Sequence, residues 1–370
     1  VELPRLLDRA RAMARACDPS VAAARNPAAV LGAILGEMAS SSGNGESLPR
    51  ARDKLTILAS AEIAAFGDWL EQLIAESTGK SGTGILPVVR EPLGVPEDYG
   101  EDRLFVYLEL KGSEVPVADG VTSVDDALQA LQDAGHPLVH IRLHDLYDLG
   151  GQFFLWELAT AIAGQRLGIH PFNQPNVESA KARAKEMIER YREEGVLPED
   201  RPVLSVPGIT VYGDLQARDL RAALRAILAQ VTRGAPSPHA AQGYVALQAF
   251  VRPDDETTAA LQDLRLLLRD KSGLATTFGY GPRFLHSTGQ LHKGDSGGGI
   301  FIQLTSDPPV DAVVPDKLGS PDSSLTFGVL IQAQALGDRQ ALAEAGRYVV
   351  RFHLDEPVAL AVRHLADALG

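Results

Sequence analysis

Short aliphatic runs that are typical of buried strands alternate with amphipathic segments typical of helices along most of this 370-residue chain. In the first half, strands are predicted at 54–58, 85–89, 104–110 and 136–143, with helices at 63–76, 125–134, 152–167 and 177–193. In the second half, strands are predicted at 244–251, 299–305, 325–331 and 348–354, with helices at 217–231, 254–270, 339–345 and 358–369. Strands that alternate with helices favour a parallel, doubly wound sheet flanked by helices. We therefore expect an α/β protein.

Breaks in this pattern suggest how the chain divides into domains. Residues 4–40 have the spacing of two helices, and the chain starts inside the first of them without a Met, so we expect a piece of a longer polypeptide. A Ser/Gly-rich loop at 40–49 and a Pro-containing linker at 197–202 follow. The predicted domains are 1–49, 50–198 and 203–370. Two further stretches rich in Pro, Ser, Gly and Asp, 233–242 and 306–324, are expected to be mobile loops.

Charge and cysteine content exclude several classes of function. The net charge of −13 is a poor footprint for phosphate backbones, so nucleic acid is not the expected partner. Cys17 is the only cysteine, which rules out an intrachain disulfide or a cysteine-based metal cluster and suggests the cytoplasm. No apolar run approaches the roughly 20 residues that cross a bilayer, so no membrane partner is expected.

Two short motifs resemble well-known catalytic signatures without their context. Gly294-Asp295-Ser296-Gly297-Gly298 spells the nucleophile region of chymotrypsin-like proteases, but the surrounding pattern is α/β and lacks the accompanying His motif. Ser77 to Ser81 ends like a phosphate-binding P-loop, but Ile74 stands where the first glycine is needed and a helix precedes it. Flexible turns explain both better.

Two longer stretches are more specific. His170-Pro171-Phe172-Asn173-Gln174-Pro175-Asn176-Val177-Glu178-Ser179-Ala180-Lys181 resembles the C-terminal signature of phosphoglucose isomerases, and Gly151 to Ile169 looks like the helix before it. Glu76-Ser77-Thr78-Gly79-Lys80, followed by a strand and Arg90-Glu91-Pro92-Leu93-Gly94, is similar to the family's Glu-Ser-x-Gly-Lys turn and Glu-Pro loop. The resemblance spans residues 50–190 in the family's order. It implies a sugar-isomerase (SIS-like) fold, with a second α/β domain after it.

The segment from Gly281 to Gly294 looks like the end of the bacterial fusion of transaldolase with glucose-6-phosphate isomerase. The isomerase's first half, with its phosphate loop, has no counterpart in this sequence. The resemblance therefore implies an upstream transaldolase/isomerase segment as a possible partner and a homo-oligomer. It also implies interconversion of glucose 6-phosphate and fructose 6-phosphate with neither metal nor redox cofactor.

The resemblance also implies catalytic residues. Glu91 matches the family's base, which moves a proton between C2 and C1 through a cis-enediol. Lys181 matches the active-site lysine, which assists ring opening and offsets charge on the enediolate. An exposed loop glutamate and a surface lysine remain the plain alternatives. The family's ring-opening histidine has no match, and His286 or His292 is the proposed substitute.

The expected substrate-binding residues are polar groups of the same motifs: Gln174, Ser77, Thr78, Lys80 and Arg283. Gln174 can hold a sugar hydroxyl or a phosphate oxygen, and Arg283 a phosphate. A structural role for residues 76–80 is as plausible as a ligand role. The rival function is a non-catalytic sugar-phosphate-binding module, or an inactive fragment that lacks the phosphate-binding half.

Overall fold

The computed structural model describes residues 2–40, 51–118, 120–198, 200–230, 243–355 and 357–370. These form two compact units. Unit 1 consists mainly of the chain up to Gln174, and unit 2 mainly of the chain from Pro175 onward. The domain boundaries predicted at residue 49 and between residues 198 and 203 stay predictions. The loops predicted at 40–49 and 233–242 lie outside the described residues, apart from Ser40 at the start of the first.

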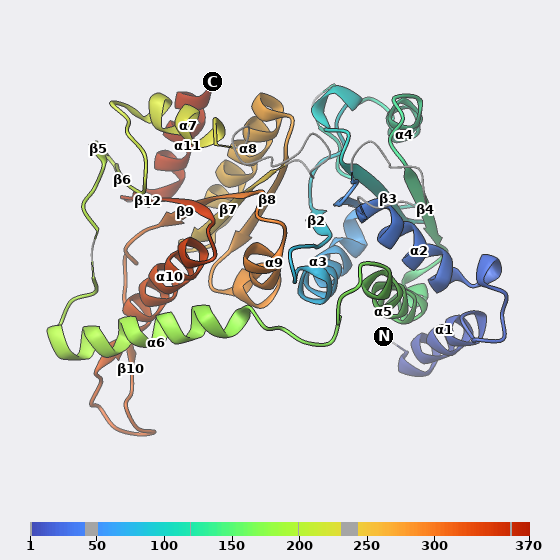
Figure 1. Cartoon of the computed structure of the whole chain (residues 1–370), viewed down its shortest axis with the longest axis horizontal. Coiled ribbons are helices and arrows are strands. Elements are labelled where there is room, and N and C mark those ends of the chain that lie inside the picture. The colour runs from blue at the N-terminus through green and yellow to red at the C-terminus, as the bar shows by residue number, and fades with distance from the viewer. Residues whose placement is uncertain (1, 41–50, 119, 199, 231–242, 356) are drawn as a thin grey trace. The chain divides into compact units, whose positions relative to one another are not determined.

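Unit 1 contains a four-stranded sheet in the order β2-β1-β3-β4, in which all neighbours are parallel (Figure 1). Its strands are β1 (Lys54–Ala59), β2 (Leu86–Val89), β3 (Arg103–Leu110) and β4 (Leu138–Leu143). Its α-helices are α1 (Leu3–Ala16), α2 (Pro27–Ala39), α3 (Ala64–Thr78), α4 (Val124–Asp133) and α5 (Leu149–Arg166). Short 3-10 turns are η1 (Ala23–Arg25), η2 (Ala61–Ile63), η3 (Pro96–Asp98) and η4 (Leu146–Asp148).

The two faces of this sheet are covered differently. On one face, β1 and β3 side chains pack with α2, α3 and α5 in a core that includes Leu35, Leu70 and the fully buried Trp156. The other face packs against α4 and the loop after β2, where Leu93, Tyr99 and Phe105 meet Leu131. That loop positions Glu91.

Unit 2 contains a six-stranded sheet in the order β5-β6-β12-β9-β7-β8. Its strands are β5 (Leu204–Val206), β6 (Ile209–Tyr212), β7 (Tyr244–Phe250), β8 (Ala275–Tyr280), β9 (Gly299–Thr305) and β12 (Tyr348–Leu354), and a separate ladder pairs β10 (Val313–Val314) with β11 (Leu325–Thr326). Its helices are α6 (Val177–Glu194), α7 (Leu220–Leu228), α8 (Asp255–Ser272), η5 (Arg283–His286), α9 (Gly289–Gly294), α10 (Phe327–Glu344) and α11 (Val358–Leu369). The strands β8, β7, β9 and β12 are parallel, and the edge strands β6 and β5 run antiparallel.

The parallel strands of both units have the same order. Ranked along the chain, β2-β1-β3-β4 and β8-β7-β9-β12 each read second, first, third, fourth. In such sheets ligands bind beyond the carboxyl ends of the strands, where the order reverses. The predicted α/β class, with parallel sheets flanked by helices, is confirmed.

The strand predicted at 325–331 is wrong beyond its first two residues. Only Leu325 and Thr326 are extended, and Phe327–Glu344 is one continuous helix that includes the segment predicted at 339–345. The Thr326 side chain accepts a hydrogen bond from the Val329 main-chain N–H and so caps this helix. Small residues such as Gly328 and Gly337 line its buried side and hide its helical period.

Candidate functional site

The end of α3 and the turn after it hold two of the predicted substrate-binding residues, Thr78 and Lys80, in structural contacts. The Thr78 hydroxyl donates to the Ile74 carbonyl at 2.7 Å and accepts from the Ile85 main-chain N–H at 3.0 Å. The buried Lys80 ammonium donates to the carbonyl oxygens of His170 and Asn173. Burial lowers the pKa of Lys80, which nearby Glu76 partly offsets. Lys80 thus ties the signature loop to the end of α3.

Gln174 belongs to the same cluster. Its side-chain amide donates to the Glu76 carboxylate at 3.2 Å and its side chain is exposed. Ser77, which follows Glu76 in the sequence, is half-buried. The signature loop and the Glu-Ser-x-Gly-Lys turn, about 95 residues apart in sequence, therefore meet within unit 1. This contact is a finding of the structure, whereas substrate binding by these residues stays a prediction.

Glu91 follows β2, and its side chain is fully buried. Its carboxylate Oε2 lies 3.5 Å from Nη1 of Arg103, whose side chain is also fully buried. The same Nη1 donates to the Thr56 hydroxyl at 2.7 Å, and the guanidinium stacks 5.3 Å from the centre of the Tyr99 ring. Mutual attraction and this hydrogen bond offset part of the cost of removing both charges from water, because Nε and Nη2 of Arg103 are buried without a hydrogen-bond partner among the described residues. No sequence motif pointed to Arg103 as the partner of Glu91.

The unit 1 candidates do not converge on one point. Lys80 precedes β2, and Glu91 follows it, so the two residues lie at opposite ends of that strand. Only Glu91 is at the carboxyl end, where ligands of parallel sheets bind.

Lys181 is placed by α6 in unit 2. Its ammonium lies 2.9 Å from the Glu178 carboxylate one turn earlier, and both side chains are more than half exposed. The helix α6 packs closely on α10. A Cβ added at Gly337 would lie 2.5 Å from the Ala184 main-chain nitrogen, which shows how near the two backbones are. That close approach fixes the helical face that carries Lys181.

A cavity of about 50 Å³ brings Lys181 and His286 together within unit 2. It is lined by α6, η5, α9 and α10, through Ala180, Lys181, Ala184, Leu285, His286, Gly289, Lys293 and Gln334. The exposed His286 reaches it from η5, which follows the carboxyl end of β8. Two of the four predicted catalytic residues therefore share one cavity, although they are 105 positions apart in the sequence.

His292 and Arg283 are placed differently. His292 is buried against Phe301 and Phe284, and one ring nitrogen lies 3.3 Å from the Gln248 amide. Burial, reinforced by the charges of Lys293 and Arg347, lowers the pKa of His292 well below its usual value, so its ring is neutral at pH 7. Arg283 is exposed and is not among the residues lining the cavity. Of the two proposed histidines, His286 is the accessible one.

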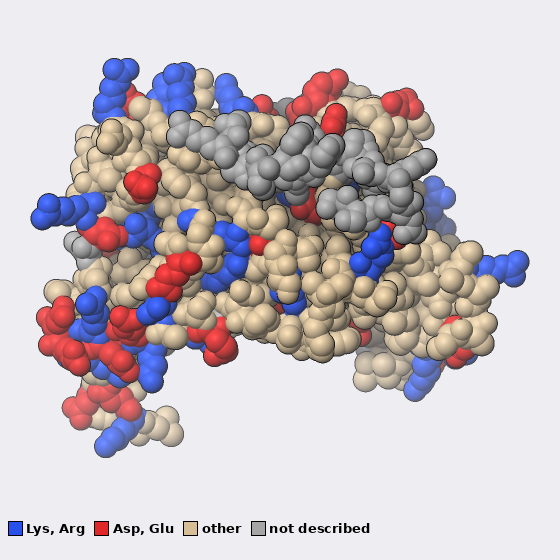
Figure 2. All heavy atoms as spheres, in the orientation of Figure 1, with Lys and Arg blue, Asp and Glu red and all other residues tan. Residues whose placement is uncertain are grey.

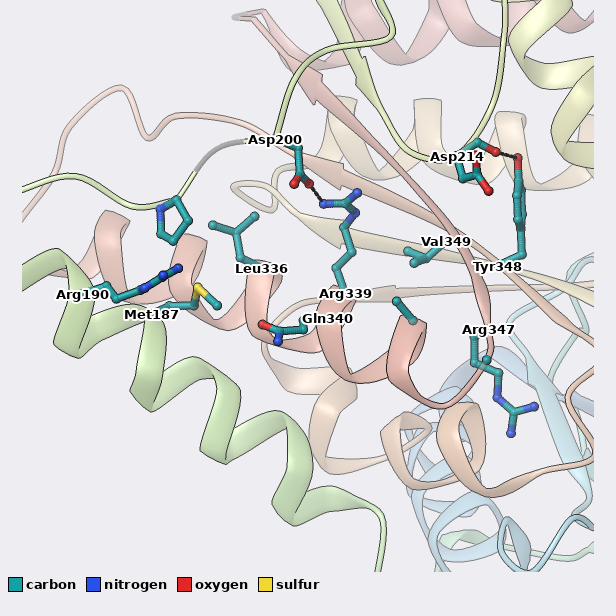
Figure 3. A pocket seen from close by; sticks show the side chains of 13 residues that line it. Met187, Arg190, Asp200, Asp214, Leu336, Arg339, Gln340, Arg347, Tyr348 and Val349 are labelled. Atoms are coloured by element: carbon teal, nitrogen blue, oxygen red, sulfur yellow. Dashed lines mark hydrogen bonds and ion pairs between the residues drawn. The ribbon is translucent and has the colours of Figure 1, made fainter. Parts of the chain in front are cut away.

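A second cavity in unit 2, of about 610 Å³, lies between α6, α10 and the start of β12. Figure 3 shows Arg339 directed at Asp200, with which it forms an ion pair. Arg347 donates to the main-chain oxygens of His292 and Lys293 at 3.0 and 2.8 Å. These arginines are engaged by protein groups, and the cavity adjoins the amino end of β12, so it is the weaker candidate.

Charged side chains of both signs share the surface of α6. Acidic and basic side chains are interspersed over α6, as Figure 2 shows, and several of them pair along the helix, including Lys185 with Glu189. Among the described residues, no group of His, Cys, Asp and Glu side chains is arranged to hold a metal ion. None of the described helices has the length and apolarity to span a membrane.

No protein-family model matches the chain. A segment is 29% identical over 199 residues to the glucose-6-phosphate isomerase of Parabacteroides distasonis, covering 46% of this chain and 43% of that protein. Another match, to the probable glucose-6-phosphate isomerase of Natronomonas pharaonis, is 30% identical over 156 residues and covers 34% and 36% of the two chains. The solved glucose-6-phosphate isomerase of Chlamydia trachomatis aligns with 99% of this chain and 72% of its own, at 13% identity and a TM-score of 0.28.

The matches to the two sequence relatives span about two fifths of their length. Over that part, and at about 30% identity, this chain is homologous to glucose-6-phosphate isomerases.

Proposed function

We propose that the chain is an aldose–ketose isomerase that interconverts glucose 6-phosphate and fructose 6-phosphate. The observation that carries the proposal is the shared cavity of Lys181 and His286, because one of these residues comes from the family signature and the other supplies a missing function. The names of the partial relatives support the same substrates.

The proposed chemistry moves protons only. His286 donates a proton to the ring oxygen as the C1 hydroxyl loses its proton to water, so that the C1–O5 bond breaks and an open-chain aldehyde forms. A carboxylate, for which the resemblance indicates Glu91, takes the proton from C2 and returns it to C1. The electron pair from C2–H forms the C1=C2 double bond, while the π pair of the C1 carbonyl moves onto O1. The O2–H proton then passes to O1 as the ketone forms at C2, and the C1=C2 pair takes up the returned proton at C1. Lys181 offsets the negative charge that develops on the enediolate oxygen.

Glu91 is the least supported member of this set. Its side chain is fully buried beside Arg103, so the carboxylate is out of reach of a substrate carbon in this conformation. That burial favours the second candidate function, a sugar-phosphate-binding module without turnover. The kinship with transaldolase fusions and a homo-oligomeric assembly belong to the proposal on resemblance alone.

The test is conversion of fructose 6-phosphate to glucose 6-phosphate by the whole chain, read through a coupled dehydrogenase. We expect Lys181→Met, His286→Gln and Glu91→Gln each to lower turnover about 100-fold or more. Lys185→Met is the matched control, because Lys185 lies one turn along α6 and is exposed in a comparable ion pair.

Undiminished turnover in both Lys181→Met and His286→Gln contradicts the assignment of the cavity. If the parent chain has no turnover but fructose 6-phosphate raises its melting temperature, the binding module replaces the isomerase, since a ligand that prefers the folded state must stabilise it.

A further inference from the structure

Gln290 is a fully buried polar side chain on α9, and its amide forms two hydrogen bonds with Asn176, where α6 begins. Its Oε1 accepts from the Asn176 main-chain N–H at 2.9 Å. Its Nε2 donates to Oδ1 of the Asn176 side chain at 2.7 Å. One side chain therefore holds the main chain and the side chain of the residue through which the chain enters α6.

Asn176 does not play its usual local role here. Asn is a preferred residue at helix N-caps, because its side-chain oxygen accepts a hydrogen bond from a main-chain N–H of the first turn. Within the described part of α6, the Asn176 side chain makes no such bond, and its oxygen is bound by Gln290 instead. A side chain suited to capping thus serves a contact between two elements.

The other contacts of α9 make it a rigid support. Lys293 forms a buried ion pair with Asp338 of α10, in which Nζ and Oδ1 are 2.5 Å apart. The Arg347 guanidinium donates to the main-chain oxygens of His292 and Lys293, which ties the end of α9 to the start of β12. Buried ion pairs are costly to break. Gln290 therefore connects the start of α6 to an element that is itself fixed.

Lys181 lies between two fixed points of α6. Asn176, five residues before it, is held by Gln290. Ala184, three residues after it, lies against the α10 backbone at Gly337. An α-helix rises 1.5 Å per residue, so about 12 Å of helix separates the two points. The helix cannot slide or turn between them without breaking one of these contacts.

We propose that Gln290 is a positioning residue that acts through Asn176 on Lys181. By fixing the start of α6, it holds Lys181 at the cavity that His286 also lines. Only two residues separate η5, which carries His286, from α9, which carries Gln290. The effect on catalysis rests on the proposed function, in which Lys181 and His286 act on one substrate. A misplacement of about 1 Å is enough to lower turnover about 100-fold.

The placement is tested without turnover by cross-linking the whole chain. In Lys181→Cys/His286→Cys, a short bifunctional thiol reagent bridges the two thiols only when they lie close together. Cys17, the only native cysteine, is buried and does not compete. We expect Gln290→Met, which has the same length but no amide, to slow the cross-linking about fivefold or more. Lys185→Cys/His286→Cys is the matched control, because Lys185 lies one turn further along α6 and is not among the residues that line the cavity.

Turnover of fructose 6-phosphate adds the catalytic readout. Gln290→Met should lower kcat about tenfold or more with KM within about twofold, because Lys181 offsets charge that develops in the transition state. Asn176→Asp keeps the main-chain N–H and an acceptor for Nε2, so its kcat should stay within about threefold of the parent's. Loss of stability alone would change neither constant well below the melting temperature.

Cross-linking that does not depend on Gln290, or that is no faster than in the Lys185 control, overturns the positioning role whatever the turnover. An active isomerase whose kcat is unchanged in Gln290→Met also overturns it. Cross-linking that depends on Gln290 in a chain without turnover supports the placement and removes the proposed function. If Gln290→Met does not fold, Asn176→Ala replaces it. Loss of one of the two hydrogen bonds should then slow cross-linking about twofold or more, and an unchanged rate is contrary.

Discussion

At the scale of single residues, the buried ion pair of Glu91 and Arg103 allows the structural role of Glu91 to be measured apart from a catalytic one. Arg103→Met leaves the Glu91 carboxylate buried without its cation, and such losses cost about 3–5 kcal/mol. Arg90→Met is the control, because Arg90 adjoins Glu91 but pairs with Asp68 at the surface, where ion pairs contribute at most about 1 kcal/mol. Urea unfolding of both variants should show this difference. Equal, small losses would mean that Glu91 is not held as the structure shows.

A second residue-scale prediction concerns Asp53, which pairs with the buried Lys54 at 2.6 Å near Asp102. Burial raises the pKa of Asp53 to about 6, and the Asp102 charge adds to this while Lys54 opposes it. Because the pKa in the unfolded chain is about 3.9, the folded state binds this proton more tightly. The resulting stabilisation is present below pH 4 and is lost as the pH rises through 6.

Asp53→Asn removes that titration. Between pH 4 and 7, the free energy of unfolding of the parent should therefore fall relative to that of the variant, by on the order of 2 kcal/mol. Chemical denaturation at several pH values measures the difference. Parallel curves for the two proteins would show that Asp53 titrates normally in the fold.

At the scale of elements, the sequence predicts strands and helices well where large apolar residues mark the period, as in β3 and β7. It fails at α10, where Phe327 to Ile331 has the composition of a strand and the buried positions further on are mostly Gly and Ala. Small residues give a weak periodic signal, but they are needed here because α10 approaches the α6 backbone at Gly337. The packing that makes the helix is thus the reason why its pattern is hard to read.

This close approach predicts a contrast between two identical substitutions. Gly337→Ala places a Cβ against the Ala184 backbone, and overpacking of this kind costs about 1–3 kcal/mol. Gly67→Ala in α3 meets only Val89 at 3.9 Å, so the higher helix propensity of Ala should stabilise by up to about 1 kcal/mol. Thermal unfolding distinguishes the signs. Destabilisation by both substitutions would contradict this account.

At the scale of the whole molecule, motifs identified the segments that carry candidate chemistry, but only the fold shows which of them meet. Lys181 and His286 share a cavity because residues of α6, η5, α9 and α10 line it together. Neither Lys293 with Asp338 nor Arg103 with Glu91 was predicted as a pair, because the partners are 45 and 12 positions apart and no local pattern links them. Contacts between distant side chains depend on packing, which a single sequence does not display.

The chain builds two separate cores, and this predicts that unit 1 folds by itself. The two core clusters around its sheet draw only on residues between Met13 and Leu167. The Lys80 contacts to His170 and Asn173 lie within the same stretch. A fragment ending at Gln174 should therefore show one cooperative urea transition by circular dichroism. Leu70→Ala, at a fully buried position, should shift that transition by about 2–5 kcal/mol. A fragment that unfolds without a cooperative transition, or that ignores Leu70→Ala, would mean that this core depends on residues after 174.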